Sequence, residues 1–342
     1  MNDYKIIGVD LAKKKFHLVA FDESQKIVFK GGMKREDFFE WAQGLQDQFF
    51  VMEACSGSHY TAQILQGFGH RVCLLKPRDV KAFAKSRQKN DLNDAIAICR
   101  AGLDETLKRV HIKNKQEQEI SYLHRARQNA IRQRIQRSNS LMTSLQEFGY
   151  IVSCGKSAFA KRCKEVIAQA LNEQFISTIV YQQMVRDCEE IEALLVREKE
   201  IDRLILQENR DNPQTHLLQT IPGIGPINAS ILSNKCMADY ESPKDFAASL
   251  GLVPRQHTTG GHIRLGAISK QGDRYARTML IQGARSIVMR LYKPNPPKTK
   301  LYQFAQHLRE SGKSFNLVCV AVANKLARIS YACTMAQTSY RA

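Results

Sequence analysis

The 342-residue chain lacks the features of a secreted, membrane-spanning or zinc-binding protein. No stretch approaches the ~18 consecutive apolar residues of a membrane span. The first five residues lack the basic start and long apolar run of a secretory signal. Its nine cysteines are scattered singly without a CxxC pair, so neither a zinc site nor a disulfide framework is indicated. These absences predict a cytoplasmic protein that has no membrane partner and keeps its cysteines mostly reduced.

Proline is missing between residues 78 and 212, and only three glycines interrupt that stretch. Such a composition predicts long helices. Apolar residues recur at helical spacing from Gln116 to Leu145, and a mixed-charge helical pattern follows from about Tyr181 to Glu208. The two stretches predict an antiparallel helical hairpin, an oligomerisation arm, or both.

Acidic residues are few beside basic ones, with 33 Asp and Glu against 51 Lys and Arg, a net charge of +18 and a pI near 9.6. A polyanion is the expected partner. Residues 251–314 hold twelve basic residues and two acidic ones, which favours a phosphate-binding face over a basic surface that serves solubility alone. An arginine row on the 116–145 helix, which includes Arg125 and Arg132, favours nucleic-acid contact over a merely solvated face.

Strand and helix patterns alternate over the first hundred residues and predict an α/β layer around a mixed sheet. The strands are expected at residues 4–10, 16–21, 49–53 and 71–75. Helices are expected through residues 38–45 and 58–68 and from Pro77 onward.

Four carboxylates fall at the ends of these predicted elements. Asp10 and Glu53 end strands, while Asp91 and Asp94 share one face of the first turn of a helix that Asn90 could cap. Acids also simply favour a helix N-terminus, and that interpretation stays open for the two aspartates taken alone. Because four clustered carboxylates repel one another, the set predicts a site for Mg²⁺, or alternatively Mn²⁺.

A short loop at residues 255–266 is the candidate reaction centre. It combines adjacent hydroxyls, glycines that let a ligand approach the backbone, and cationic side chains, namely Thr258, Thr259, Gly260, Gly261, Arg255 and Arg264. The loop contains no acid, so any metal-binding carboxylates must come from elsewhere in the chain.

The Ile-Pro-Gly-Ile-Gly segment at residues 221–225 marks a new domain. It is typical of a helix-hairpin-helix turn that binds phosphate, although the same turn can merely pack two helices. Residues 269–273 are expected to cap a helix through Ile287, and a proline-containing linker at 292–300 leads to helices near 301–310 and 315–335.

Together these motifs resemble the DEDD-type insertion-sequence transposases and the related Piv-like site-specific invertases. The matching segments, whose order and spacing extend over nearly the whole chain, are Ile7–Asp10 with Lys13, Met52–Ala54 with Gly57 and Tyr60, Asn90–Ala95, and residues 221–225, 251–255 and 264–273. The resemblance implies a RuvC/RNase H-like α/β domain at 1–112, a helical coiled-coil arm at 113–212 and a mainly helical C-terminal transposase domain at 213–342.

The resemblance also implies a bridge-RNA-guided recombinase of an insertion sequence. Asp10, Glu53, Asp91 and Asp94 would hold Mg²⁺ while a hydroxyl attacks a DNA phosphodiester. The implied partners are donor and target DNA, a guide RNA from the flanking element and further copies of the chain in a homodimer or homotetramer, in the nucleoid. The nucleic-acid contacts would come from Arg255, Arg264, Lys270, Arg274, Arg277, Arg125 and Arg132.

Thr259 stands where the family places its catalytic serine. Three interpretations stay open: Thr259 is the nucleophile, Thr258 replaces it, or this copy is impaired, because the extra methyl group of threonine crowds in-line attack. The alternatives in function are a metal-dependent RuvC-like junction nuclease without a covalent intermediate, a sugar-kinase-like ATPase suggested by Gly8–Asp10, and a non-enzymatic nucleic-acid-binding protein.

Overall fold

The computed structural model describes residues 4–84, 91–259 and 262–341, with the backbone alone for residues 257, 259, 262 and 263. Its contacts divide the chain into two compact units, Met1–Gln118 and Glu119–Ala342. The three-part division at residues 112 and 212 stays a prediction.

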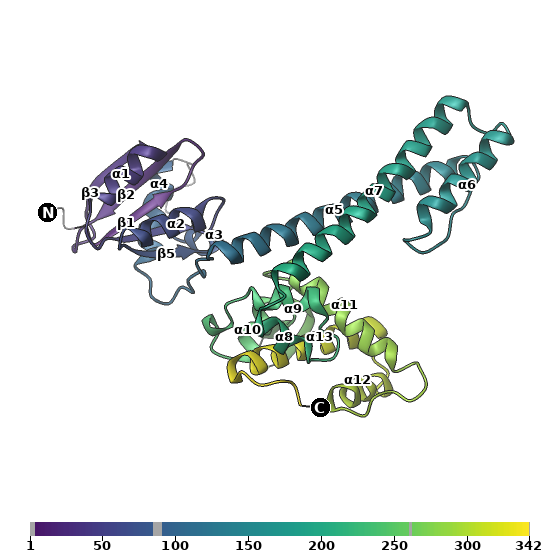
Figure 1. Cartoon of the computed structure of the whole chain (residues 1–342). Helices are drawn as coiled ribbons and strands as arrows, with labels where there is room; N and C mark the ends of the chain where they lie inside the picture. Colours follow the sequence, from purple (N-terminus) through teal and green to yellow (C-terminus); the bar gives the residue numbers. More distant parts are fainter. Residues whose placement is uncertain (1–3, 85–90, 260–261, 342) are drawn as a thin grey trace. The chain divides into compact units, whose positions relative to one another are not determined.

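The first unit is built on a five-stranded mixed sheet in the order β3-β2-β1-β4-β5 (Figure 1). The strands are β1 Ile6–Asp10, β2 Lys15–Phe21, β3 Ile27–Lys34, β4 Phe49–Glu53 and β5 Arg71–Leu75. β1 pairs antiparallel with β2 and parallel with β4, which confirms the predicted mixed sheet. β3 was not predicted, because this edge strand alternates exposed with half-buried residues and carries Gly31 and Gly32 in place of β-forming side chains.

Helices cover both faces of this sheet. α1 Arg35–Gln43 and α2 Ser58–Gly67 pack on the face that presents Ile7, Val9 and Leu18. The opposite face, which includes Ile6, Val19 and Val51, packs against α4 Asp91–Gly102. A short helix, α3 Pro77–Lys81, begins at the predicted proline. Since side chains alternate along a strand, every second residue of β1, β2 and β4 faces α4.

Long helices, predicted from the missing prolines, begin at the end of the first unit and make up the first part of the second. They are α5 Lys115–Glu147, α6 Phe159–Asn172 and α7 Thr178–Glu208. Salt bridges join α5 to α7 in antiparallel order, from Arg127–Asp202 through Arg134–Glu198 to Arg137–Glu190. The predicted helical hairpin is therefore present.

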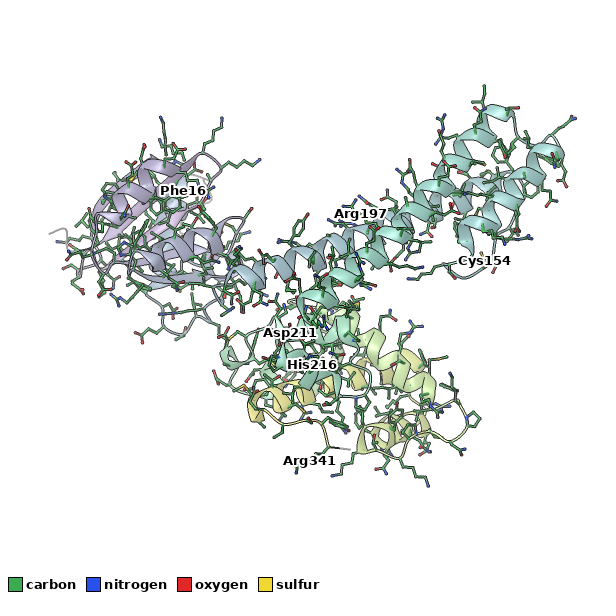
Figure 2. All side chains as sticks on the ribbon, viewed as in Figure 1. Phe16, Cys154, Arg197, Asp211, His216 and Arg341 are labelled. Atoms are coloured by element: carbon green, nitrogen blue, oxygen red, sulfur yellow. The ribbon has the colours of Figure 1, made fainter. Side chains whose placement is uncertain are left out.

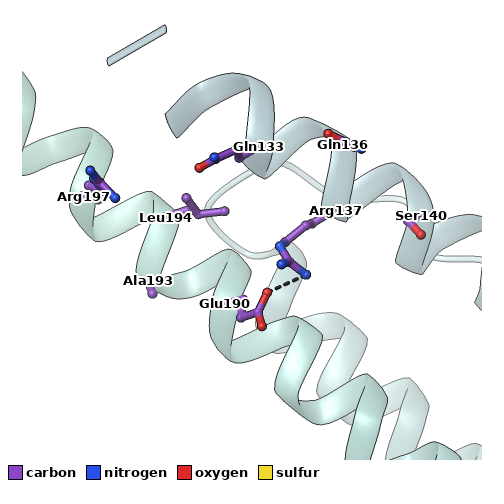
Figure 3. A pocket seen from close by; sticks show the side chains of 8 residues that line it. All are labelled: Gln133, Gln136, Arg137, Ser140, Glu190, Ala193, Leu194 and Arg197. Atoms are coloured by element: carbon purple, nitrogen blue, oxygen red, sulfur yellow. Dashed lines mark ion pairs between the residues drawn. The ribbon is translucent and has the colours of Figure 1, made fainter. Parts of the chain in front are cut away.

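Two apolar clusters hold this hairpin, one around Leu145 and Cys188 and one around Ala130 and Ile205. Between them lies a polar groove lined by Gln133, Gln136, Arg137, Ser140, Glu190, Ala193, Leu194 and Arg197. Figure 3 shows the ion pair of Arg137 and Glu190 in this groove. Figure 2 places Arg197 on α7 and Cys154 in the loop that precedes α6.

The remainder of the second unit is mainly helical. Its elements are α8 Pro213–Gln219, α9 Pro226–Ser233, a 3₁₀ turn at Met237–Asp239, α10 Pro243–Ser249, β6 Pro254–Thr259, β7 His262–Ile268, α11 Arg274–Arg290, α12 Lys300–Glu310 and α13 Phe315–Ala336. The expected loop at residues 255–266 is instead an antiparallel β-hairpin. Its β-branched residues suit paired strands, and the register runs from Pro254 opposite Ile268 to Thr259 opposite His262.

The turn between α8 and α9 packs against α11. Gly223 has φ +82°, and a Cβ atom there would lie 2.9 Å from the carbonyl oxygen of Gly283. A Cβ atom on Gly283 would lie 2.1 Å from the carbonyl oxygen of Gly223. The glycines therefore permit a close contact between turn and helix, which favours the packing interpretation over phosphate binding.

Among the described residues, α13 is the one helix whose length and composition would suffice to cross a membrane, although Asn324, Lys325 and Arg328 interrupt its apolar run. In the structure 56% of its most apolar window is buried. Its residues Val318, Val322 and Leu326 belong to the core of the second unit. Core helices of globular proteins meet the same length and composition criteria, so this helix is weak evidence for a membrane span.

Candidate active site

The four predicted acids lie together at one edge of the sheet in the first unit. β1 and β4 are parallel neighbours, so Asp10 and Glu53 occupy adjacent strand ends. Both residues have the strand parity of the face that α4 covers. α4 begins at Asp91 and carries Asp94 in its first turn. The predicted cap Asn90 lies outside the described residues.

The carboxylates interact through their charges, and among the described residues ligand atoms of Asp10 and Asp91, together with His17, lie within 4.8 Å of one another, a group that does not include Glu53 or Asp94. Burial raises the pKa of Asp10 above its ordinary value, and the negative charges of Asp94 and Asp91 raise it further. Burial likewise raises the pKa of Glu53, to which Asp10 and Asp94 add. Each of these two carboxyl groups is thus easier to protonate than in water, and a bound cation would relieve the same repulsion.

The helix that carries two of the acids is seated on β1 without an intervening side chain. A Cβ atom on Gly8 would lie 2.6 Å from both the carbonyl oxygen of Ala95 and the Sγ atom of Cys99. The Gly8 amide donates to Cys99 Sγ at 3.0 Å, and the thiol donates to the Val19 carbonyl at 3.1 Å. Burial raises the pKa of Cys99 to about 12, so the thiol stays protonated. This contact fixes the distance between α4 and the strand that bears Asp10.

His17 also lies in this cluster, although none of the sequence motifs includes it. It is directly opposite Asp10 in the β1–β2 register. Single ligand atoms of Asp10, His17 and Asp91 all lie within 4.8 Å of one another. A lone histidine in a strand belongs to no motif. However, if the turn of the predicted hairpin is centred on Lys13 and Lys14, residues 10 and 17 lie opposite each other, and this register could have identified His17.

The side chains of the cluster fit a divalent cation. Carboxylate oxygens are the preferred ligands of Mg²⁺ and Mn²⁺, and imidazole nitrogen is a further ligand for transition metals. Metal–ligand distances of about 2.1 Å place neighbouring ligand atoms about 3.0 Å apart and opposite ones about 4.2 Å apart in octahedral geometry. The spacing of Asp10, His17 and Asp91 is within reach of that arrangement.

The candidate nucleophile lies in the second unit, in the β6–β7 hairpin. Thr259 is the last residue of β6, its backbone pairs with His262, and its side chain, like Gly260 and Gly261, lies outside the description. Thr258 is exposed, and its hydroxyl accepts a hydrogen bond from Gln256 Nε2 at 2.9 Å.

The predicted nucleic-acid contacts of the second unit differ in exposure. Arg255, Arg264, Lys270 and Arg274 are exposed, as phosphate contacts require. Arg277 is 7% exposed, and its guanidinium donates to the carbonyls of Leu250 at 2.9 Å and Gln271 at 3.1 Å. The structure therefore contradicts the assignment of Arg277 to nucleic-acid binding. The spacing of charges in α11 could not reveal that this position faces the core.

The arginine row of α5 is divided in the same way. Arg127, Arg134 and Arg137 form salt bridges with acids of α7. Arg125 and Arg132 are exposed, and Arg132 bonds to Asn129 on its own helix. Part of the row thus stabilises the hairpin, while Arg125 and Arg132 face solvent.

Comparison with known proteins agrees with these motifs. Residues 7–149 match a DEDD transposase family, and residues 215–303 match the family described as "Transposase IS116/IS110/IS902 family". A "probable family 20 transposase" of Pseudomonas aeruginosa is 34% identical over 98% of both chains. The "transposase for insertion sequence element IS1328" of Yersinia enterocolitica is 33% identical over 99% of both chains. A "pilin gene-inverting protein" of Moraxella bovis is 24% identical over 95% of this chain and 94% of its own.

Proposed function

Because the chain belongs to the IS116/IS110/IS902 family of transposases, which confirms the resemblance of its motifs, we propose that it recombines DNA through attack of the Thr259 hydroxyl on a phosphodiester. Transposases cleave and recombine DNA, and a DEDD domain implies use of a divalent metal. In this proposal the metal is Mg²⁺, and a guide RNA selects the DNA.

The observation that carries the proposal is the cluster of Asp10, Glu53, Asp91 and Asp94. Two of these acids have pKa values raised by burial and by the other acids, an arrangement that costs stability unless a cation is bound. When bound, Mg²⁺ would neutralise charge on the phosphate and lower the pKa of an attacking hydroxyl. The acids would hold the ion, and the close contact between Gly8 of β1 and Cys99 of α4 sets the spacing of Asp91 and Asp94 from Asp10.

The proposed reaction is a pair of transesterifications. A bond forms between the threonine oxygen and phosphorus while one P–O bond of the DNA breaks. The hydroxyl proton leaves to a base, and the departing sugar oxygen takes up a proton. The resulting phosphothreonine bond conserves the energy of the phosphodiester, so a sugar hydroxyl of a second strand can attack it and release the enzyme. The exposed cations Arg255, Arg264 and Lys270 would stabilise the charged phosphate.

The rest of the chain would bind nucleic acid and further copies. We assign the first unit to a RuvC-like fold on its mixed sheet with carboxylates at the ends of two parallel strands. The α5–α7 hairpin would act as a coiled-coil arm in a homodimer or homotetramer, and Arg125, Arg132 and Arg274 would contact backbone phosphates. Guide RNA would be recognised by shape and backbone, in the cytoplasm at the nucleoid.

The test is to trap the covalent intermediate. Purified full-length protein is incubated with end-labelled donor and target DNA, its co-purified RNA and Mg²⁺, then denatured and separated by mass. We expect a DNA adduct with wild type, no adduct with Thr259→Ala or Asp94→Asn, and a faster adduct with Thr259→Ser because the crowding methyl is removed. An adduct that persists in Thr259→Ala while Thr258→Ala abolishes it would move the nucleophile to Thr258.

The competing function is a metal-dependent junction nuclease that uses the same acids with water as nucleophile. Threonine at the nucleophile position is the observation that favours it. Cleavage that requires Asp94, forms no adduct and is unimpaired in Thr259→Ala would establish the nuclease. RNA guidance is tested separately by sequencing the RNA that co-purifies with protein expressed alongside its flanking DNA, and recovery of no discrete RNA would overturn it.

A further inference from the structure

We propose that His17 is a ligand of the catalytic metal, together with Asp10 and Asp91, and that it shifts the preference of the site from Mg²⁺ toward Mn²⁺. The inference deepens the proposed function and rests on its metal site. It adds an imidazole nitrogen to a site that the acidic motifs define as oxygen-only.

The backbone register places His17 beside the acids. β1 and β2 are antiparallel, and residue 17 pairs directly with residue 10. Directly paired residues project to the same face of a sheet, which is the face that α4 covers. The imidazole is therefore held next to Asp10 by strand pairing, with the first turn of α4 above it.

The unsatisfied nitrogen of His17 indicates a cation. Its Nδ1 atom is sealed from solvent and has no hydrogen-bond partner among the described residues. It lies 3.4 Å from Asp91 Oδ2, in a geometry that makes no hydrogen bond. The side chain of His17 is 19% exposed, whereas that of Asp91 is 65% exposed. A lone pair on Nδ1 facing carboxylate oxygens is favourable only when a proton or a metal cation lies between them. The absence of hydrogen-bond geometry between the two groups favours the metal.

The neighbouring strand leaves room for the imidazole to adjust. Gly32 of β3 pairs with His17 on the side away from Asp10. A Cβ atom on Gly32 would lie 2.3 Å from Lys15 Cε and 3.1 Å from His17 Cδ2, both tighter than ordinary contact. A side chain at this position would displace the flexible end of Lys15 and press on the His17 ring, whereas glycine leaves both in place.

An imidazole ligand has a predictable effect on metal choice. Nitrogen ligands favour transition metals over Mg²⁺, which prefers oxygen and retains water. We expect His17→Gln to weaken Mn²⁺ binding by about 10-fold or more, the loss typical of disturbed metal ligation, and to weaken Mg²⁺ binding less.

The experiment uses the full-length protein and Mn²⁺ as the probe. Binding is titrated by electron paramagnetic resonance, and pulsed measurements detect coupling of the bound Mn²⁺ to a ligand ¹⁴N nucleus. Wild type should bind Mn²⁺ with a ¹⁴N coupling, His17→Gln should lose the coupling, and His111→Gln should retain it. His111 is a matched control, since it also faces a carboxylate, that of Glu117 at 2.9 Å.

The outcomes separate this inference from the proposed function. Mn²⁺ binding that requires Asp10 but shows no ¹⁴N coupling, or unchanged coupling in His17→Gln, would overturn the role of His17 and leave the carboxylate site intact. No Mn²⁺ binding that depends on Asp10 would instead overturn the metal site itself.

A second pair of variants tests the geometry without touching a ligand. Gly32→Ala should weaken the ¹⁴N coupling because its Cβ atom, besides displacing the flexible end of Lys15, presses on the imidazole. Gly31→Ala should leave the coupling unchanged, since its Cβ atom would lie 3.5 Å from the Phe29 ring in ordinary contact. Equal effects of the two substitutions would contradict the placement of His17.

Discussion

The seam between α4 and β1 makes a sharp prediction for Gly8→Ala. The added Cβ atom would lie 2.6 Å from the carbonyl oxygen of Ala95, whereas ordinary contact begins near 3.4 Å. α4 would have to retreat by about 0.8 Å, or β1 bend by as much. Overpacking of this kind costs about 1–3 kcal/mol. Weakening the hydrogen bond from Gly8 to Cys99 Sγ would add about 1 kcal/mol.

The same displacement carries Asp91 and Asp94 away from Asp10. A loss of about 1 kcal/mol lowers the melting temperature of a domain near 100 residues by about 4–8 °C. A shift of nearly 1 Å within a catalytic site can cost about 100-fold in rate. We therefore expect Gly8→Ala to lower the unfolding temperature of the first unit, metal affinity and strand cleavage together.

Thermal unfolding by calorimetry, Mn²⁺ titration and cleavage of labelled DNA would measure the three effects. Gly67→Ala is the matched control, because a Cβ atom there would meet nothing within 4 Å. That variant should be neutral, or more stable by a few tenths to about 1 kcal/mol. If Gly8→Ala behaves like Gly67→Ala in all three assays, the close contact between α4 and β1 does not set the distance of Asp91 and Asp94 from Asp10.

Two further predictions concern charge. Since burial raises the pKa of Asp10, the folded state holds this proton more tightly than the unfolded chain, and the free energy of unfolding falls as pH rises from about 4 through the folded pKa. Metal-free Asp10→Asn should therefore unfold at a higher temperature than wild type at pH 7 but not at pH 3.5. Saturating Mg²⁺ at about 100 times Kd should stabilise wild type by about 2.7 kcal/mol and remove the stability advantage of Asp10→Asn. A difference in unfolding temperature between the two proteins that does not depend on pH, measured by calorimetry, would contradict this account. Arg277→Lys should destabilise the protein by about 1–3 kcal/mol and leave the salt dependence of DNA affinity unchanged, because Arg277 binds backbone carbonyls. Arg274→Ala should instead reduce the slope of log affinity against log salt concentration by about one. The reverse pattern in salt-dependent binding assays would restore Arg277 as a phosphate contact.

The sequence predicted most of the elements because their patterns are local. Apolar alternation located β1, β2, β4 and β5, and the missing prolines located α5 and α7. β3 was not predicted because Ile27 and Val28 are about half exposed, so they show no apolar alternation, and glycines follow them. The expected loop proved to be a hairpin because strand pairing, which a single segment does not reveal, satisfies its backbone.

The candidate site was predictable to the extent that motifs mark it. Asp10, Glu53, Asp91 and Asp94 stand at element ends, and the fold of the first unit brings them to one edge. His17 required knowledge of the β1–β2 register, and the buried state of Arg277 required knowledge of which face of α11 meets the core. The placement of His17 and the burial of Arg277 both depend on contacts between distant segments, and these contacts cannot be deduced from the charge and spacing of residues within one segment.

The thiol of Cys99 can report the separation of α4 from β1. It is fully buried, protonated at neutral pH, and lies on the same helix as Asp91 and Asp94, on the face that packs against β1 and β2. An alkylating reagent can reach it only during excursions in which α4 lifts from β1, so the labelling rate at this one peptide counts those excursions. Slower labelling on addition of Mg²⁺ or DNA would therefore show that the bound ligand keeps α4 packed against β1 for more of the time, without any probe attached to the molecule.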